Sequence, residues 1–234
     1  MSSLHTLIFY ATPEHACSYL PNHRATTMFV DPKATVDGPL YSQLSRLGFR
    51  RSGNHYYRPH CGACQACIPV RVPVKDFTPH RSQRRTIARN QDLQVQIAKP
   101  SYSEEHYQVY ERYITQRHRD GDMYPPSREQ YRSFLIDGSH FTRFVEFRLE
   151  DRLIGVAVID LLDDGFSAIY TFYDPAESDR GLGTYAILWQ IEEVKRRSEQ
   201  YLYLGYWIKE CHKMAYKTKF RPLEMMVNDR WVQI

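Results

Sequence analysis

The order of helix and strand patterns after residue 100 most constrains the fold of this chain. Capping signals predict helices that begin near residues 104 and 128. Strand patterns follow at 144–149, 152–161 and 166–173, then a helix at 183–197, a strand at 201–207, a helix at 209–219 and a strand at 223–227. A helix between two strands predicts a right-handed crossover between parallel neighbours, and therefore an α+β fold around a mixed sheet.

The first hundred residues predict a smaller α+β domain with a basic surface. The pattern favours a helix that ends at Gly48, a hairpin over 49–58, a strand over 67–77, and a helix from Thr78 to about Asn90. The apolar strand pattern before Lys99-Pro100 ends there, and a helix start follows. We therefore expect one domain at 1–99 and a second at 100–234.

Composition narrows the class of protein. The 234 residues include 42% hydrophobic residues, enough for one large core or two small ones. No apolar run approaches the ~20 residues of a membrane span, and the first twenty residues lack the basic start and cleavage site of a secretion signal. The odd number of cysteines does not suit a disulfide framework. A cytoplasmic protein with no membrane partner is expected.

Positive charge is concentrated in one stretch. Residues 46–90 hold ten Lys or Arg and one acid, Asp76, although the whole chain has a net charge of only +4. Such asymmetry favours an anionic partner, and nucleic acid is the usual one; a solvated basic face is the alternative. The candidate contacts to nucleic acid, such as the unpaired acceptor end of a transfer RNA, are Arg50, Arg51 and Arg58 beside two tyrosines of the hairpin, and Arg81, Arg84, Arg85 and Arg89 on the following helix.

Three cysteines lie within seven residues, at Cys61, Cys64 and Cys67. Thiolates at this spacing suit a structural zinc ion or an iron–sulfur cluster, for which Cys17 is the first candidate as fourth ligand and His60 the second. The alternative is a turn in which the thiols only pack. A cysteine nucleophile is disfavoured because no histidine and acid accompany any one thiol in the pattern.

The strand order resembles the GCN5-related N-acetyltransferase fold, in which two parallel strands part and hold an acyl donor. The turn from Arg180 to Thr184 lies where that fold binds the donor's phosphate, although its spacing differs from the coenzyme A pattern. A plain helix start is the alternative. Downstream, Lys209, Lys213 and Lys217 fall on one face of the expected helix, which is otherwise the pattern of a solvated lysine face.

Several longer stretches resemble the arginyl-transfer RNA–protein transferase family, and its bacterial branch, the aspartate/glutamate leucyltransferases, in particular. The stretches are Tyr19-Leu-Pro, Met28-Phe-Val-Asp-Pro32, Gly48-Phe-Arg-Arg-Ser-Gly53, Tyr57-Arg-Pro-His-Cys61 to Arg71, Arg81-Ser-Gln-Arg-Arg85 to Asn90, and Tyr206-Trp-Ile to Lys217. The resemblance implies transfer of leucine from leucyl-transfer RNA to an N-terminal Asp or Glu, which marks proteins for N-end-rule degradation. In eukaryotic relatives, four cysteines hold an iron–sulfur cluster.

The resemblance also implies roles for side chains. The donor ester is already activated, so the chemistry requires no cofactor. Backbone N–H groups of residues 168–173 are expected to face the oxyanion. Tyr170, Tyr173 and Tyr206 are the catalytic candidates, as hydroxyl donors to the leaving ribose oxygen, unless they are core aromatics. The candidate cations for the acidic acceptor side chain are Arg71, Arg180, Lys213 and Lys217.

Three other functions remain open on the sequence alone. The first is transfer of arginine in place of leucine, which depends on the apolar or acidic lining of one small pocket. The second is an acetyltransferase that uses acetyl-coenzyme A. The third is a non-enzymatic RNA-binding module built on the cysteine turn and the arginine helix.

Overall fold

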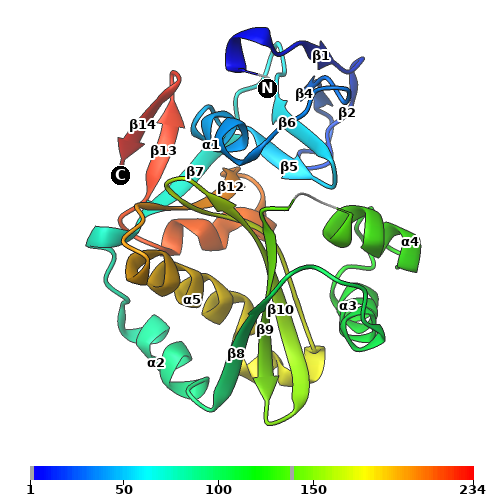
Figure 1. Ribbon diagram of the computed structural model, residues 1–234. Helices are drawn as coiled ribbons and strands as arrows, with labels where there is room; N and C mark the ends of the chain where they lie inside the picture. The colour runs from blue at the N-terminus through cyan, green and yellow to red at the C-terminus, as the bar shows by residue number, and fades with distance from the viewer. Residues whose placement is uncertain (1–2, 138–139) are drawn as a thin grey trace.

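An eight-stranded mixed sheet organises the computed structural model, which describes residues 3–137 and 140–234 (Figure 1). The strand order is β14-β13-β7-β12-β11-β10-β9-β8. Its strands are β7 Ile68–Pro73, β8 Leu93–Ala98, β9 Thr142–Leu149, β10 Arg152–Leu162, β11 Gly165–Tyr173, β12 Tyr201–Trp207, β13 Glu224–Val227 and β14 Arg230–Gln233. The predicted α+β class with a mixed sheet is confirmed.

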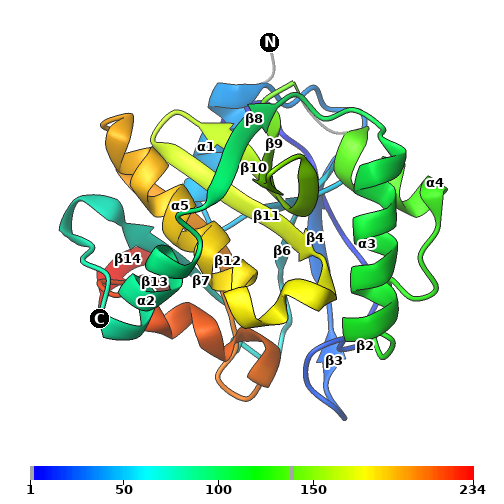
Figure 2. The ribbon, with the colours of Figure 1, turned by 90° about the horizontal axis from the view of Figure 1, so that it is seen from below.

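Helices cover both faces of this sheet. The α-helices are α1 Gly38–Arg46, α2 Arg81–Arg89, α3 Glu104–Arg117, α4 Arg128–Tyr131 and α5 Leu182–Arg196, and the short helices are η1 Leu4–Thr6, η2 Val74–Asp76, η3 Arg132–Ile136, η4 Pro175–Arg180 and η5 His212–Lys219. Helix α5 lies on one face with α2 beside it, and α3 lies on the other (Figure 2). Within the described residues, no helix is both long and apolar enough to cross a bilayer.

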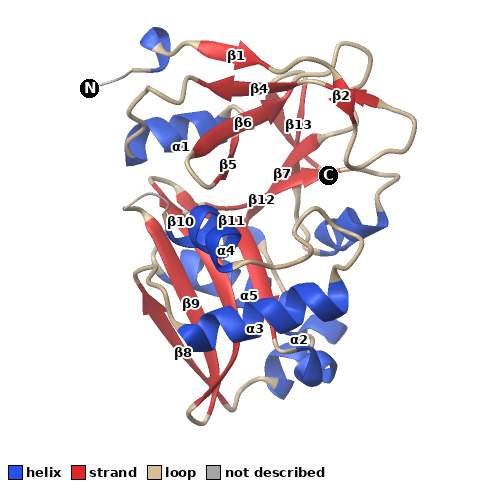
Figure 3. Cartoon of the chain, turned by 90° about the vertical axis from the view of Figure 1, so that its right-hand side faces the viewer, coloured by secondary structure: helices blue, strands red, loops and turns tan. Residues whose placement is uncertain are grey.

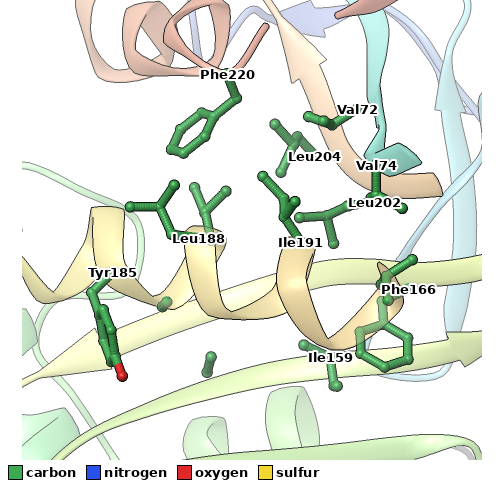
Figure 4. Packing of buried hydrophobic residues seen from close by; sticks show 14 of the residues in the cluster. Val72, Val74, Ile159, Phe166, Tyr185, Leu188, Ile191, Leu202, Leu204 and Phe220 are labelled. Atoms are coloured by element: carbon green, nitrogen blue, oxygen red, sulfur yellow. The ribbon is translucent and has the colours of Figure 1, made fainter. Parts of the chain in front are cut away.

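Strands β11 and β12 pair in parallel, and the predicted crossover connects them. Gly165, Phe166 and Ser167 pair with Tyr201, Leu202 and Tyr203, and α5 connects the two strands. Leu188 and Ile191 on α5 pack among Leu202 and Leu204 of β12 (Figure 4). The strand expected at 201–207 is confirmed as β12. Its apolar residues are buried on both sides of the sheet, as in a central parallel strand.

The large sheet crosses the domain boundary expected at Lys99-Pro100. Strand β7 lies between β13 and β12, and β8 forms the opposite edge beside β9. Residues before the boundary therefore share the core of residues after it. The strand expected at 67–77 ends at Pro73, where η2 turns the chain.

A smaller sheet stands beside the end of the large one (Figure 3). Its order is β1-β4-β6-β5, with α1 against it and a separate β2-β3 pair nearby; the strands are β1 Phe9–Ala11, β2 His15–Ala16, β3 Arg24–Ala25, β4 Thr27–Val30, β5 Arg50–Ser52 and β6 His55–Pro59. The helix that ends before Gly48 and the hairpin after it are confirmed. Asp37 caps α1, because its side chain accepts a hydrogen bond from the backbone N–H of Leu40.

Two helix boundaries differ from the prediction. Helix α2 begins at Arg81, not after Thr78, because the side chain of Gln83 accepts from the backbone N–H of His80 and sets the cap there. The segment 209–219 forms η5, a 3₁₀ helix, over His212–Lys219. With three residues per turn, Lys213 and Lys217 no longer share a face. Lys213 is exposed and Lys217 is buried.

A buried ion pair joins the small sheet to the large one. Arg51 on β5 donates from Nε and Nη2 to the two carboxylate oxygens of Asp160 on β10, both at 2.7 Å. Neither side chain has exposed surface. Thr142 donates to Asp160 as well, and Arg51 donates to the carbonyl oxygen of Gly53. The assignment of Arg51 to transfer RNA is therefore wrong, because the guanidinium is enclosed by protein.

Loss of Arg51 should leave the buried carboxylate of Asp160 without a charge partner. We expect Arg51→Met to lower the free energy of unfolding by ~3–5 kcal/mol, because Asp160 would keep its burial and lose its charge partner. Arg58→Met is the matched control. Arg58 pairs with the exposed Asp229, so its loss should cost less than ~1 kcal/mol. Urea unfolding measures both, and equal losses in the two variants would contradict the assignment.

Candidate functional site

A cavity of about 680 Å³ opens where β11 and β12 part. Beyond Ser167 and Tyr203 the two strands no longer pair, and each carries an extra residue, Ile169 on β11 and Leu204 on β12. A bulge turns the backbone locally and leaves the extra residue outside the regular pairing. The two bulges therefore widen the gap between the strands at the level of the cavity.

Arg50 fills the apex of this gap. Its guanidinium donates to Ser167 Oγ at 2.7 Å and to the carbonyl oxygen of Ala168, both on β11. Across the gap it lies against Gly205 of β12, where an added Cβ would be 3.0 Å from the arginine Nε. The basic sequence pattern predicts that Arg50 contacts transfer RNA. The structure instead places its side chain in the cavity lining, held by β11.

The cavity carries charge of one sign. Among the described residues that line it there is no Asp or Glu, whereas four have basic side chains: Arg50, Arg117, Lys213 and Lys217. His118 lies with them, and burial first, then Lys213 and Arg117, holds its pKa below the ordinary value. Such a lining attracts carboxylates and phosphates and repels a cationic side chain.

Lys217 is the basic residue of the lining whose pKa is most changed by burial. Its side chain lies in the cavity wall, and the residue is 7% exposed. Burial, with a smaller contribution from Arg50, lowers the pKa of the amine to about 7. Lys213 differs, because its side chain is 62% exposed and pairs with Asp120 at 2.6 Å.

Most of the other large side chains in the lining are aromatic or aliphatic. The aliphatic side chains are Ile169, Ile187, Leu204 and Met214, and the tyrosines are Tyr19, Tyr57, Tyr113, Tyr170, Tyr173, Tyr206 and Tyr216. The structure thus brings all three tyrosines expected at the catalytic centre into one cavity. Nothing in the structure tests their catalytic roles.

These three tyrosines differ in the partners of their hydroxyl groups. Tyr206 donates to the carbonyl oxygens of Gly48 at 2.8 Å and Tyr57 at 3.2 Å, so its hydroxyl is committed to the backbone. The hydroxyls of Tyr170 and Tyr173 have no hydrogen-bond partner among the described residues. Burial raises the pKa of Tyr170, so this hydroxyl stays protonated and able to donate.

The turn before α5 contributes backbone to the same cavity. Gly181 adopts a left-handed conformation with φ of 67°, and Ser178, Gly183 and Thr184 line the cavity with it. Arg180 points away, because its guanidinium pairs with Asp92 and Glu177. The backbone of the turn thus borders the cavity, where the sequence predicts that an anion binds. The side chain of Arg180 does not line the cavity.

Arg71 also lies outside the lining. Its guanidinium donates to Glu224 at 2.6 Å and to Tyr203, and it stacks over the rings of Tyr201 and Trp231. Its charge is therefore compensated within the sheet. Arg71 and Arg180 both became candidates because the sequence shows their charge but not their distant partners.

The arginine helix lies next to the turn. Thr86 of α2 is the neighbour that an added Cβ on Gly181 would contact, at 3.7 Å. Arg84 donates to the carbonyl of Pro79, and Arg89 donates to the carbonyl of Asp179. Arg81, Arg84, Arg85 and Arg89 are all exposed, so their charge faces solvent close to one rim of the cavity.

The cysteines line a second cavity of about 590 Å³, whose wall also includes Tyr19, Tyr57 and Tyr206. Cys17, Cys61, Cys64 and Cys67 all border it. Burial first, then the neighbouring thiols, raises the pKa of Cys67 to about 12. Among the described residues, no three His, Cys, Asp or Glu side chains gather closely enough to hold a metal ion. This arrangement does not fit zinc or an iron–sulfur cluster.

Arg117 and His118 were not among the expected site residues. They lie at the end of α3, where His118 is the cap, and His118 packs on the ring of Tyr113 at 4.9 Å. Their pattern is that of an ordinary helix end. Only the tertiary contact of α3 with β11 reveals that this end borders the cavity.

Comparison with known proteins identifies relatives over the whole chain. The profile of the arginine-tRNA-protein transferase N terminus matches residues 15–85, and that of the C terminus matches residues 105–227. An aspartate/glutamate leucyltransferase from Marinobacter nauticus is 58% identical over 99% of this chain and 98% of its own length. Another from Hahella chejuensis is 56% identical over the full length of both chains.

Two solved structures share part of the chain's shape at low identity. L-PGS from Bacillus licheniformis has a TM-score of 0.47 and 13% identity, over 61% of this chain and 46% of that one. The C-terminal domain of a putative lysylphosphatidylglycerol synthetase from Agrobacterium fabrum has a TM-score of 0.47 and 12% identity, over 76% and 54%.

The contact between Arg50 and Gly205 should make that glycine hard to replace. Gly205 has φ of 80°, and an alanine there would meet Arg50, so we expect Gly205→Ala to lower the free energy of unfolding by ~1–2 kcal/mol or more. Gly62→Ala is the control, because an added Cβ there has no neighbour within 4 Å. Thermal unfolding of both variants measures the difference. A Tm for Gly205→Ala equal to that of the control would contradict this packing.

Proposed function

The chain belongs to the arginine-tRNA-protein transferase family as an aminoacyl-tRNA–protein transferase, and we propose that the cavity between β11 and β12 is where it transfers leucine to N-terminal Asp or Glu. This transfer marks proteins for N-end-rule degradation. The observation that supports the site best is a lining that combines an aliphatic patch with cations and, among the described residues, has no acid. Leucyl-transfer RNA and acceptor proteins are its partners.

The lining suits leucine as the donor side chain. Ile169, Ile187, Leu204 and Met214 offer an apolar surface for an isobutyl group. An arginyl side chain would bring a guanidinium to a cavity in which no described carboxylate could pair with it. The cations disfavour an arginyl side chain and the aliphatic residues favour a leucyl one, so a single lining accounts for the choice of donor.

The acceptor's acidic side chain meets the cationic rim in this proposal. Arg117 and Lys213 are the candidates at the rim. The sequence-based candidates Arg71 and Arg180 are left out because they lie outside the lining and are paired with acids there. The bulge at Ile169 leaves backbone outside the regular pairing of β10 and β11. We assign stabilisation of the oxyanion to N–H groups of this bulge, and a hydrogen bond to the ribose oxygen to a hydroxyl such as that of Tyr170.

Helix α2 and the smaller sheet form the proposed dock for transfer RNA. The exposed arginines of α2 adjoin the turn at Gly181, which lines the cavity, so phosphates along α2 would lead the acceptor end inward. Arg58, which lines the second cavity, remains a candidate contact to transfer RNA. Arg50 and Arg51 do not, because Arg50 is bound to β11 and Arg51 is fully buried. The parting of two parallel strands after a helical crossover supports a GCN5-related N-acetyltransferase-like fold. We place the enzyme in the cytoplasm, where charged transfer RNA is present.

The reaction itself is tested by a donor comparison. Leucyl-transfer RNA should label peptides that begin with Asp or Glu, arginyl-transfer RNA should label them poorly, and ribonuclease should abolish labelling. Peptides that begin with Ala are the acceptor control. Labelling from acetyl-coenzyme A that is indifferent to ribonuclease would indicate an acetyltransferase, and RNA binding without labelling would indicate a binding module.

Charge removal on α2 should weaken the complex with transfer RNA. Replacement of Arg81 and Arg85 by Gln should raise KM for leucyl-transfer RNA, leave the KM for the acceptor peptide unchanged, and reduce the slope of affinity against salt by about one per lost phosphate contact. Lys195→Gln is the control, because Lys195 is exposed on α5 outside the cavity lining. If the double variant and the control had the same salt slope, α2 would not contact the RNA.

A further inference from the structure

Lys217 occupies an unusual place for a lysine. The amine donates to the carbonyl oxygen of Tyr206 at 2.5 Å, and this is its only hydrogen bond to a described residue. It lies in the wall of the cavity, while its neighbour Lys219 on η5 is exposed. A charged ammonium has three N–H donors, so the buried charged form would leave two of them without a protein acceptor.

The charges around Lys217 also disfavour its protonated form. The ring of Tyr216, centred 5.9 Å from the amine, weakly favours the charged form, but Arg50, which faces the amine from β5, disfavours that form. Cys211, at the start of η5, acts in the opposite direction with a smaller effect. Lys213 and Arg117 add positive charge to the same lining. The amine thus stands ready to take up a proton and to release it near neutral pH.

We propose that Lys217 moves a proton from the acceptor's attacking nitrogen to the leaving ribose oxygen of leucyl-transfer RNA. This inference rests on the proposed function, since it assigns a step within the same cavity. It also revises the sequence-based role of Lys217 as the cation that binds the acidic side chain. A neutral amine lacks the charge for that role, which leaves it to Arg117 and Lys213.

The step balances without any further reactant. The neutral α-amine of the acceptor attacks the ester carbonyl carbon, forms the new C–N bond and becomes positively charged. Lys217 takes one proton from that nitrogen. As the carbonyl re-forms, the C–O bond to the ribose breaks, and the lysine ammonium donates its proton to the released oxygen. The products are an amide and a ribose hydroxyl, and Lys217 is neutral again.

His118 is the rival proton carrier in the cavity. It lies at the outer rim, where Lys213 and Asp120 face it and the lysine side chain is 62% exposed. Lys217 instead lies beside β12, hydrogen-bonded to its backbone and close to Arg50 at the apex of the strand gap. The geometry therefore favours Lys217 for a proton transfer between the parted strands.

Two substitutions, one that removes the positive charge and one that keeps it, test the proposal. Lys217→Met removes both charge and base, and Lys217→Arg keeps charge but cannot lose its proton at neutral pH. Under saturating leucyl-transfer RNA and acceptor, we expect both to lower kcat by ~100-fold or more with little change in KM. Lys219→Met is the matched control and should retain the wild-type kcat, because Lys219 is exposed on the same helix and lies outside the lining.

The pH profile and the acceptor preference separate a proton carrier from a charge receptor. Wild-type kcat should fall as pH drops through about 7, and this limb should be absent from Lys217→Met. The preference for Asp over Ala at the acceptor N-terminus should be the same in both variants and the wild type. A normal kcat in Lys217→Arg, a lost acceptor preference, or a limb that disappears in His118→Gln instead would overturn the proposal.

Stability measurements guard against a folding defect. The pKa of Lys217 is lower in the folded state than in the unfolded state, so between about 7 and the ordinary lysine pKa the unfolded chain binds more protons. Burial of the Lys217 amine therefore destabilises the folded state most below pH 7, and this destabilisation disappears as the pH rises toward the ordinary lysine pKa. Lys217→Met should be at least as stable as wild type at pH 6, and Lys217→Gln provides a second variant. Failure of the wild type to transfer leucine would refute the proposed function itself.

Discussion

The hydrogen bonds of Arg50 and Arg51 to the large sheet hold the site together. Successive residues of a strand point to opposite sides, and β5 uses both sides to reach the same sheet. Arg51 ends on Asp160 of β10, and Arg50 ends on Ser167 and Ala168 of β11. The small sheet is thereby attached where β11 and β12 part, so Arg50 supplies a charge that the large sheet lacks at the apex of its own gap.

This attachment explains why the cavity combines properties that one sheet would not give. The aliphatic lining comes from β11, β12 and α5, which also build the core. The cations come from β5, the end of α3 and η5, three elements that are far apart in sequence. An ester substrate with an apolar side chain and an anionic RNA needs both surfaces at once. In the proposed site, the elements that meet at the gap therefore supply both surfaces that this substrate requires.

Local pattern was sufficient for most elements of the fold and insufficient for the partners of its charges. The strand at 201–207, its crossover and the hairpin at β5 and β6 follow from periodicity and turn residues. Arg50 and Arg51 were grouped as one basic surface, although Arg51 pairs with an acid 109 residues away. Lys213 and Lys217 were placed on one face by assuming 3.6 residues per turn, which η5 does not have. The cysteine spacing suggested a metal site, yet spacing does not specify whether the thiols converge.

A lining with positive charge alone acts on the nucleophile before any bond forms. An N-terminal Asp or Glu enters with a carboxylate and an α-ammonium, and only the carboxylate is attracted by Arg50, Arg117 and Lys213. The same field makes it easier for the ammonium to lose its proton, since the neutral amine leaves the bound group with a net negative charge. In the proposed site, acceptor selection and nucleophile activation thus have one electrostatic origin. An acceptor without the acidic side chain would be neither attracted in this way nor held where its ammonium loses a proton more easily.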